Sequence, residues 1–428
     1  MSRYKLLILM LALACVGLTC SKSTEPDDNN SPDFRTPAQL TQVEQDLVTA
    51  VNQFSFKIFN HINSEAETGK NVFASPLSVS CALGITLNGA RGQTRDQIAD
   101  GLELSGFTVE EANHAYRNLT EILTHADPAV TFDIANSFWS RLDKAIEPPF
   151  IDVCRTYFNA RIEAIDFFDP ASADTINLWV SNATNDKIDQ IVTPAVLSAS
   201  AAVLLNAIYL KANWTYPFDT ADTDDRTFYL ADGSEVECPA MYKDTEADRQ
   251  EFERYNDRPI TFLNNDYCRG VTLPYGKHGF AMTALLPRDS LTPDDLAEQL
   301  TPESWQSLLE SSVTGDAMIL LPKFKFEFEA GLNDILKAMG MPAAFDPGMA
   351  DFGAMFTDGV GWIDKVKQKA FVEVDEKGTE AAAVTVVIFT DSAPMPMNFN
   401  RPFLFIIHEQ ESGAILFMGK IANPTLES

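Results

Sequence analysis

The sequence has few of the residues from which catalytic and metal sites are usually built. Its 428 residues include five histidines and six cysteines, and no two cysteines form a CxxC pair. The GxSxG, P-loop, GxGxxG and HExxH patterns are all missing. Neither His278 nor His408 has a sequence neighbour that suggests a general base, so we interpret both as structural. These absences do not exclude an enzyme, but nothing in the sequence supports enzymatic activity, and we expect no cofactor and no metal site.

Positive charge is also scarce. The chain has 32 lysines and arginines against 61 aspartates and glutamates, a formal net charge of −29. A surface this acidic repels the phosphate backbone of nucleic acids, which argues against nucleic-acid binding. It repels anionic lipids in the same way. A connection to a membrane would therefore have to be covalent or apolar.

The apolar run at residues 6–17 is too short to span a bilayer, which takes about 20 residues. It follows a basic start, as the core of a signal peptide does. The segment ending at Cys20 resembles a bacterial lipoprotein signal, in which a lipidated cysteine becomes the mature N-terminus. Cys15 is the alternative site, and a plain secretory signal is the alternative interpretation. We expect export, either as a cell-envelope lipoprotein held to the membrane only by its N-terminal lipid or as an extracellular protein.

Residues 21–37 are polar and proline-rich, so they cannot bury enough apolar surface to offset the entropy of the chain. No linker rich in glycine, serine or proline interrupts residues 45–424. We therefore expect a signal peptide at 1–20, a disordered tether at 21–44 and one domain at 45–428.

Four cysteines follow the signal, and none has a histidine at metal-ligand spacing. An exported protein can form disulfides, and Cys238 and Cys268 are the pair closest in sequence. Their spacing does not show that they meet. We favour buried free thiols for all four, which are Cys81, Cys154, Cys238 and Cys268.

The apolar pattern predicts helices first and mostly strands afterwards. Helical spacing runs through residues 44–63, and Pro76 stands where a proline can open a second helix. Several strand-like runs alternate with period two, as antiparallel strands with one buried face do. This order indicates an α+β fold with large antiparallel sheets. Further helices are predicted near 92–103, 109–125, 147–159, 172–189 and 329–340, and strands at 131–139, 202–212, 270–274, 280–286, 317–328, 369–376, 382–389, 402–408 and 414–420.

Residues 376–398 combine a hinge-like start with a strand-like centre. Small residues at 378–383 precede a run of high β-propensity at 384–389, and Pro394 and Pro396 then resist pairing as a strand. The segment is either a buried strand leading to a loop or a loop that can become a strand. In the second case one face carries small or β-branched side chains, which enter a packed sheet at the lowest cost: Thr379, Ala381, Ala383, Thr385 and Val387.

Five motifs, in the same order, resemble those of the serpins. They lie at residues 71–80, 204–218, 321–339 and 372–383, and at the two C-terminal strands 399–407 and 415–420. The resemblance covers roughly residues 45–424, essentially the whole predicted domain.

Membership of this family implies an α+β serpin fold of three β-sheets with about nine helices and an exposed C-terminal reactive loop. A serpin is cleaved in this loop by its target protease, and the cut loop inserts into the large sheet while the protease stays covalently attached. The resemblance thus implies a suicide inhibitor of serine proteases, with cysteine proteases also open, and we expect a monomer. The alternative is a non-inhibitory serpin that acts as a binding or chaperone-like protein.

The resemblance also assigns residues to two regions. The small hinge residues match the inhibitory pattern; with the preceding glutamate they are Glu376, Gly378, Thr379, Ala381, Ala382 and Ala383. The opening of the large sheet, its breach and shutter, is assigned Ser75, Pro76, Ser78, Asn206, Trp214 and Gln368. Gln368 stands where many members have a histidine. Asn206, the usual partner of that histidine, is present, and a glutamine amide can still bond to it.

In serpins the reactive bond usually follows the seventeenth residue, counted inclusively from the hinge glutamate. With Glu376 as that glutamate, the bond lies at Ser392–Ala393. Counting back from Phe399 gives Asp391 instead. Ser392 is small and neutral, and no lysine or arginine occurs from residue 378 to 400. We therefore expect a target with a shallow specificity pocket, elastase-like or subtilisin-like, rather than a trypsin-like one.

Overall fold

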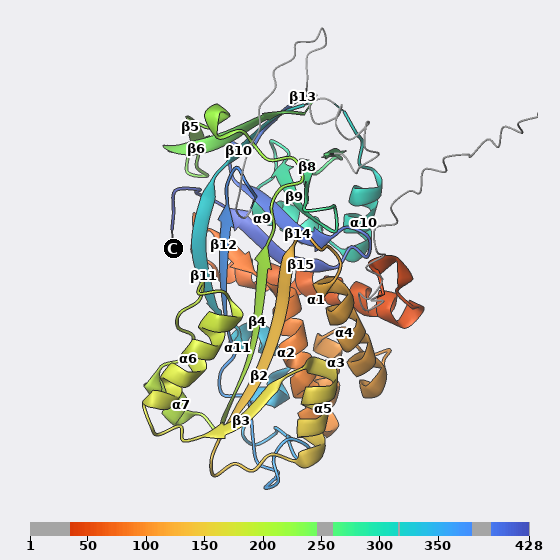
Figure 1. Ribbon diagram of the computed structural model, residues 1–428, viewed down its shortest axis with the longest axis vertical. Helices are drawn as coiled ribbons and strands as arrows, with labels where there is room; N and C mark the ends of the chain where they lie inside the picture. Colours follow the sequence, from red (N-terminus) through yellow and green to blue (C-terminus); the bar gives the residue numbers. More distant parts are fainter. Residues whose placement is uncertain (1–34, 246–259, 316, 379–394, 428) are drawn as a thin grey trace, which may run out of the picture. The chain divides into compact units, whose positions relative to one another are not determined.

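The computed structural model describes residues 35–245, 260–315, 317–378 and 395–427. Helices occupy most of the first part of this chain, coloured red to yellow-green in Figure 1. The described residues contain ten α-helices: α1 (Gln42–Glu65), α2 (Pro76–Gly89), α3 (Gly92–Gly101), α4 (Val109–Thr124), α5 (Pro148–Phe158), α6 (Ala171–Ala183), α7 (Pro194–Ala199), α9 (Pro293–Gln299), α10 (Pro302–Glu310) and α11 (Asn333–Ala338), with 3-10 turns η1 (Pro37–Gln39), η2 (Thr220–Asp222) and η3 (Pro342–Phe345).

The strands follow mainly in the second half. They are β1 (Val72–Ala74), β2 (Thr131–Arg141), β3 (Arg161–Ile165), β4 (Ala202–Lys211), β5 (Asp224–Tyr229), β6 (Glu235–Asp244), β7 (Thr261–Asn264), β8 (Cys268–Tyr275), β9 (Phe280–Pro287), β10 (Ala317–Pro322), β11 (Phe324–Gly331), β12 (Lys367–Val374), β13 (Met395–Asn398), β14 (Phe403–Glu409) and β15 (Ile415–Ile421). The α+β class expected from the sequence is confirmed.

Four hydrogen-bonded sheets form from the described strands, where the family resemblance implied three. One has six strands in the order β1-β15-β14-β9-β8-β7, and one has four in the order β13-β10-β6-β5. The other two are the sheet β3-β2-β4 and the two-stranded ribbon β11-β12. Figure 1 shows these last two side by side in one layer. The number differs because no backbone ladder joins β4 to β12 within the described residues.

Both faces of β4 are covered. Leu204 and Ile208 pack on the main core, and α2 contacts β4 on that side. Val203 and Leu205 belong to a second cluster with residues of α6. Alternation along the strand thus places the even-numbered side chains toward α2 and the odd-numbered ones toward α6.

Several predicted elements have different bounds in the structure. The helix expected near 329–340 is α11 at Asn333–Ala338, because residues up to Gly331 belong to β11. The helix expected at 172–189 ends at Ala183, because Asn185 and Asp186 take left-handed backbone angles of φ 49° and 58°. The strand expected at 317–328 is two strands in different sheets, divided at Lys323. The strand expected at 382–389 lies outside the described residues.

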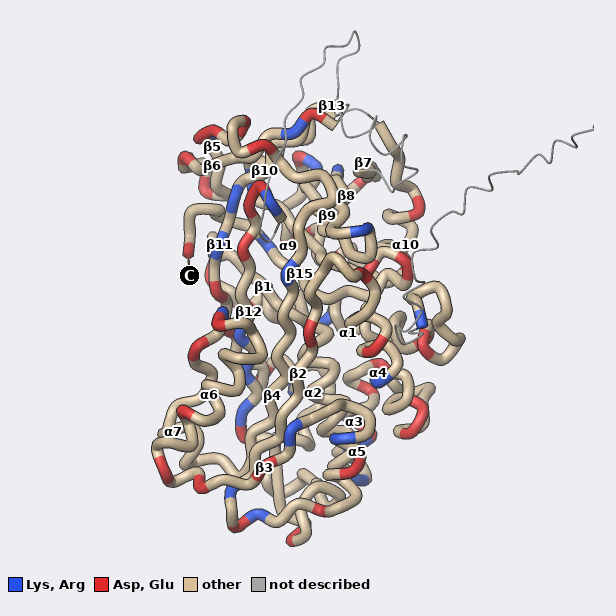
Figure 2. Tube along the Cα trace, viewed as in Figure 1, with Lys and Arg blue, Asp and Glu red and all other residues tan. Residues whose placement is uncertain are grey.

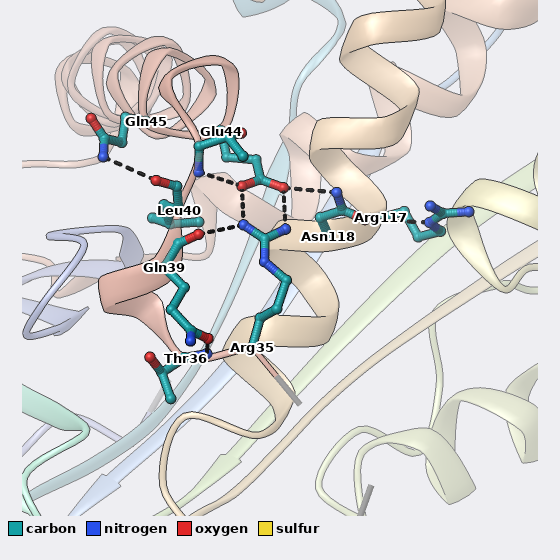
Figure 3. A network of polar contacts seen from close by, with 9 residues as sticks. Arg35, Thr36, Gln39, Leu40, Glu44, Gln45, Arg117 and Asn118 are labelled. Carbon is teal, nitrogen blue, oxygen red and sulfur yellow. Dashed lines mark hydrogen bonds and ion pairs between the residues drawn. The ribbon is translucent and has the colours of Figure 1, made fainter. Parts of the chain in front are cut away.

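Described structure begins at Arg35, ten residues before the expected domain boundary at residue 45. Arg35 donates two hydrogen bonds to Glu44, at 2.7 and 2.6 Å, and Asn118 of α4 donates a third at 2.7 Å (Figure 3). Burial alone would raise the pKa of Glu44, but these bonds and one from the Thr41 N–H outweigh it and lower the pKa to about 2. Residues 35–44 therefore belong to the fold rather than to a disordered tether.

The four cysteines beyond residue 20 are free and buried, which confirms the expectation of free thiols and leaves Cys238 and Cys268 unpaired. His408 is also buried, against Trp305 and Thr283. Burial lowers its pKa to about 4, so it is neutral at pH 7. Its role is structural, as the sequence indicated. Among the described helices none is long and apolar enough to cross a membrane.

Candidate functional site

An opening separates β4 from β12. Each strand pairs on its far side, β4 with β2 and β12 with β11, and presents the near side without a ladder partner among the described residues. A cavity of about 160 Å³ lies at this opening, and α2, β4, β12 and residues 352–366 line it. Facing backbone edges of this kind can pair with an extended segment placed between them.

The two strands meet at one end of the opening, which we call the breach. Trp214 donates its backbone N–H to Lys377 O at 3.0 Å and its indole N–H to Asp375 O at 2.9 Å. Its ring stacks on Tyr275 at 4.4 Å between centroids. Gly378 forms isolated antiparallel bridges with both Asn213 and Asp375. Trp214 thus holds the end of β12 to the chain that follows β4.

Gly378 is held where only glycine fits. Its φ is +104°, and a Cβ there would lie 2.4 Å from Trp214 N and 2.7 Å from Ala212 O. Both the left-handed angle and the close backbone approach exclude a side chain.

Glu376 anchors the hinge from within the protein. Its side chain is 8% exposed and accepts hydrogen bonds from Lys323 Nζ at 2.7 Å and Thr223 Oγ1 at 2.9 Å. Burial would raise the pKa of Glu376, but these bonds lower it further than burial raises it, so the carboxylate is ionised. The hinge prediction included Glu376 but neither partner. Lys323 does belong to one of the family motifs, but its sequence position gives no sign of this pairing.

The shutter is the group formed by Ser75, Ser78, Asn206 and Gln368, midway along the opening. The Ser75 hydroxyl donates to Leu416 O at 2.9 Å, and the Ser78 hydroxyl donates to Asn206 O at 3.4 Å. Pro76 occupies the first turn of α2, as predicted, which brings both serines to β4 and β12.

The bond between Gln368 and Asn206 that the two residue types allow is not formed. Gln368 donates its amide N–H to Ser75 O at 2.6 Å, and Asn206 donates to Asn136 Oδ1 at 2.6 Å. Asn136 was not predicted as a site residue. The one feature that marks it in the sequence is a polar amide within an otherwise strand-like run. The amide oxygens of Asn206 and Gln368 are buried and accept no hydrogen bond from the described residues.

Several predicted site residues lie outside the described residues. They are Thr379, Ala381, Ala382 and Ala383 of the hinge, Asp391, Ser392 and Ala393 around the reactive bond, and the proposed lipidation site Cys20 with its alternative Cys15. In the described ranges no cluster of three or more histidine, cysteine or acidic residues could hold a metal ion.

Comparison with known proteins gives one family. The family profile described as "Serpin (serine protease inhibitor)" matches residues 49–424. The leukocyte elastase inhibitor of Xenopus tropicalis is 32% identical over 390 residues, which cover 89% of this chain and 100% of that protein. Both overlap the whole β4–β12 opening and its hinge.

Solved structures agree with the family profile. Tengpin, a thermophilic serpin in its native state, superposes with a TM-score of 0.78 at 26% identity, covering 88% of this chain and 94% of tengpin. Human thyroxine-binding globulin gives 0.79 at 25% identity, covering 90% of this chain and 100% of the globulin. A divided sheet with a buried hinge glutamate, a matching profile and matching folds lead to one conclusion: this chain is a member of the serpin family.

Proposed function

We propose that this protein is a suicide inhibitor of serine proteases, which acts by inserting its cleaved loop between β4 and β12. The observation that carries the proposal is a match of registers. Asn206 of β4 lies seven residues before Asn213, which follows the strand. Gln368 of β12 likewise lies seven residues before Asp375. An antiparallel strand continued from Gly378 would therefore bring its seventh residue, Thr385, opposite both at once.

This shared register supports the proposal in two ways. Gly378 already bridges to both edges, so at the breach the opening has the width of one strand. The residues turned toward α2 would be the small and β-branched set predicted from the sequence, with Thr379 opposite Ala212 and Val387 opposite Leu204. The Thr385 hydroxyl would also bring one donor to this level, where it would satisfy one of the two unbonded amide oxygens, that of Asn206 or that of Gln368.

The proposed targets are elastase-like or subtilisin-like proteases, with cysteine proteases as a further class. Support comes from the small residues near Ser392, from the absence of lysine and arginine at 378–400, and from the relative named leukocyte elastase inhibitor. We further propose that the chain is exported and tethered through Cys20, so that the inhibitor acts at a cell envelope or outside the cell.

A panel of proteases followed by denaturing electrophoresis tests the inhibitory function. A covalent complex with elastase or subtilisin supports the proposal. Clean cleavage without a complex would favour the non-inhibitory alternative, in line with the name of the thyroxine-binding relative. Mass spectrometry of the released peptide locates the bond: a peptide starting at Ala393 supports Ser392, and one starting at Ser392 supports Asp391. Efficient trapping of trypsin would overturn the specificity claim.

Thr379→Arg should convert the inhibitor into a substrate, because a long cation would have to enter the packed face toward α2 at a cost of several kcal/mol. Thr379→Val is the matched control, since it keeps the shape of threonine. The ratio of inhibitor to enzyme needed for full inhibition should rise severalfold for the arginine variant alone. Equal ratios would show that residue 379 does not enter the sheet.

A further inference from the structure

The segment between α6 and α7 crosses the opening on the face opposite α2. Asn185 donates its side-chain N–H to the Tyr209 hydroxyl on β4 at 3.2 Å. Two residues later, Lys187 Nζ lies 3.6 Å from Glu373 on β12 and 5.0 Å from the centre of the Phe371 ring. We call residues 184–188 the strap, because its side chains reach both edges of the opening.

The strap crosses the opening at a defined level. Tyr209 of β4 lies four residues before Asn213, and Phe371 of β12 lies four residues before Asp375. The two rings therefore stand opposite each other, about halfway between the breach and the shutter. A strand that enters from Gly378 must pass this level before it reaches Asn206.

The strap is held differently at its two ends. Toward β4, the backbone N–H of Asp186 donates to Ser181 O at 2.8 Å, and Ile188 is buried in the cluster that contains Leu205. These contacts keep Asn185 and Asp186 in left-handed angles that non-glycine residues rarely adopt. Toward β12, the strap is held by the Lys187 side chain, which is about one third exposed. That end is therefore the one that can release.

We propose that Lys187 is a latch whose contacts with Glu373 and Phe371 hold the strap across the opening, and so slow the entry of a strand between β4 and β12. This inference rests on the proposed function, because the strand that matters in the protein is the cleaved loop. Lys187 acts as a positioning residue here, since it holds two elements together and reacts with nothing.

The chain contains a matched control in Lys325 of β11. Lys325 contacts the same two residues, with Nζ 3.2 Å from Glu373 and 5.8 Å from the Phe371 ring. It does so within the ribbon β11-β12, where further ion pairs join Lys369 to Glu327 and Lys367 to Glu329. Figure 2 marks charged residues of both signs along this ribbon. Removing either lysine deletes one cation beside Glu373, but only Lys187 spans the opening.

Lys187→Met and Lys325→Met keep the length of the side chain and change the net charge equally. The probe is a synthetic peptide with the sequence of residues 379–391, whose uptake by the intact protein is followed by native electrophoresis. We expect uptake about fivefold faster in Lys187→Met than in wild type, since one half-exposed ion pair and one cation–π contact are lost. Lys325→Met should stay within about 1.5-fold of wild type, as expected for a change inside one ribbon. Equal rates in the two variants would overturn the latch.

The salt dependence of peptide uptake gives a second test of the latch. Raising NaCl from about 0.05 to about 0.5 M should speed peptide uptake by the wild type and change Lys187→Met much less, because the screened ion pair is already absent from the variant. Urea unfolding should be the same for both variants, which separates a latch from a general loss of stability. If the wild type traps no protease but the two peptide rates differ as expected, the proposed function fails and the latch stands.

Discussion

Gly378 offers the sharpest test of the breach. Gly378→Ala places a Cβ 2.4 Å from Trp214 N, against backbone that cannot rotate away. The left-handed φ of +104° costs about 1–2 kcal/mol for alanine. Relieving the contact must shift the chain away from β4 and weaken the Trp214 N–Lys377 O bond, which adds about 2–3 kcal/mol. We expect a total loss of about 3–5 kcal/mol, from these two terms together.

Gly340→Ala is the control, because Gly340 has φ +100° and nothing within 4 Å of a Cβ. It should lose only the backbone part, about 1–2 kcal/mol. Urea unfolding, extrapolated linearly to water, measures both losses. Tryptophan fluorescence adds a local measurement. The emission should change only in Gly378→Ala, because Trp214 stacks on Tyr275 at the breach. Losses within about 0.5 kcal/mol of each other would refute the close approach at Gly378.

Three further predictions concern buried ionisable groups. Burial lowers the pKa of His408 to about 4. Between pH 6.5 and 4 this histidine therefore binds a proton in the unfolded chain but not in the folded one. Stability should fall by about 2.5 kcal/mol from pH 7 to 4.5, and His408→Gln should remove that slope in urea unfolding. Glu44, with its lowered pKa, stabilises above pH 4.5 and stops doing so as pH falls toward 2, so Glu44→Gln should cost about 2–3 kcal/mol at pH 7 and much less at pH 3. Lys323→Met should cost about 1–3 kcal/mol, because it leaves the Glu376 carboxylate buried without its cation, and Glu376→Gln in the same chain should recover part of this loss in a double-mutant cycle.

Much of the fold could be predicted because local patterns determine it. The apolar spacing of residues 44–63 and the proline at 76 marked α1 and α2, and period-two alternation marked β2, β4 and β12. The expected helix at 172–189 was six residues too long at its end, because nothing local shows that Asn185 and Asp186 adopt left-handed angles. Tertiary contacts of the strap hold those angles.

The site was only partly predictable, because its pairings join residues far apart in the chain. The family motifs assigned Ser75, Asn206, Trp214 and Gln368 to the opening of the large sheet. They did not show which amide meets which acceptor: Gln368 and Asn206 bond to Ser75 and Asn136 rather than to each other. Several donors and acceptors lie within reach there, so small differences in position decide the pairing.

The sequence by itself determined the family, the acidic surface and the set of small residues in the hinge, since each follows from residue type and order along the chain. Only the tertiary structure decided that β4 and β12 stand apart, that Gly378 touches the backbone at Trp214, and that Lys187 reaches Glu373 across the opening. Those features depend on how separate elements are placed against one another, and that placement comes from packing of the whole core rather than from any local pattern.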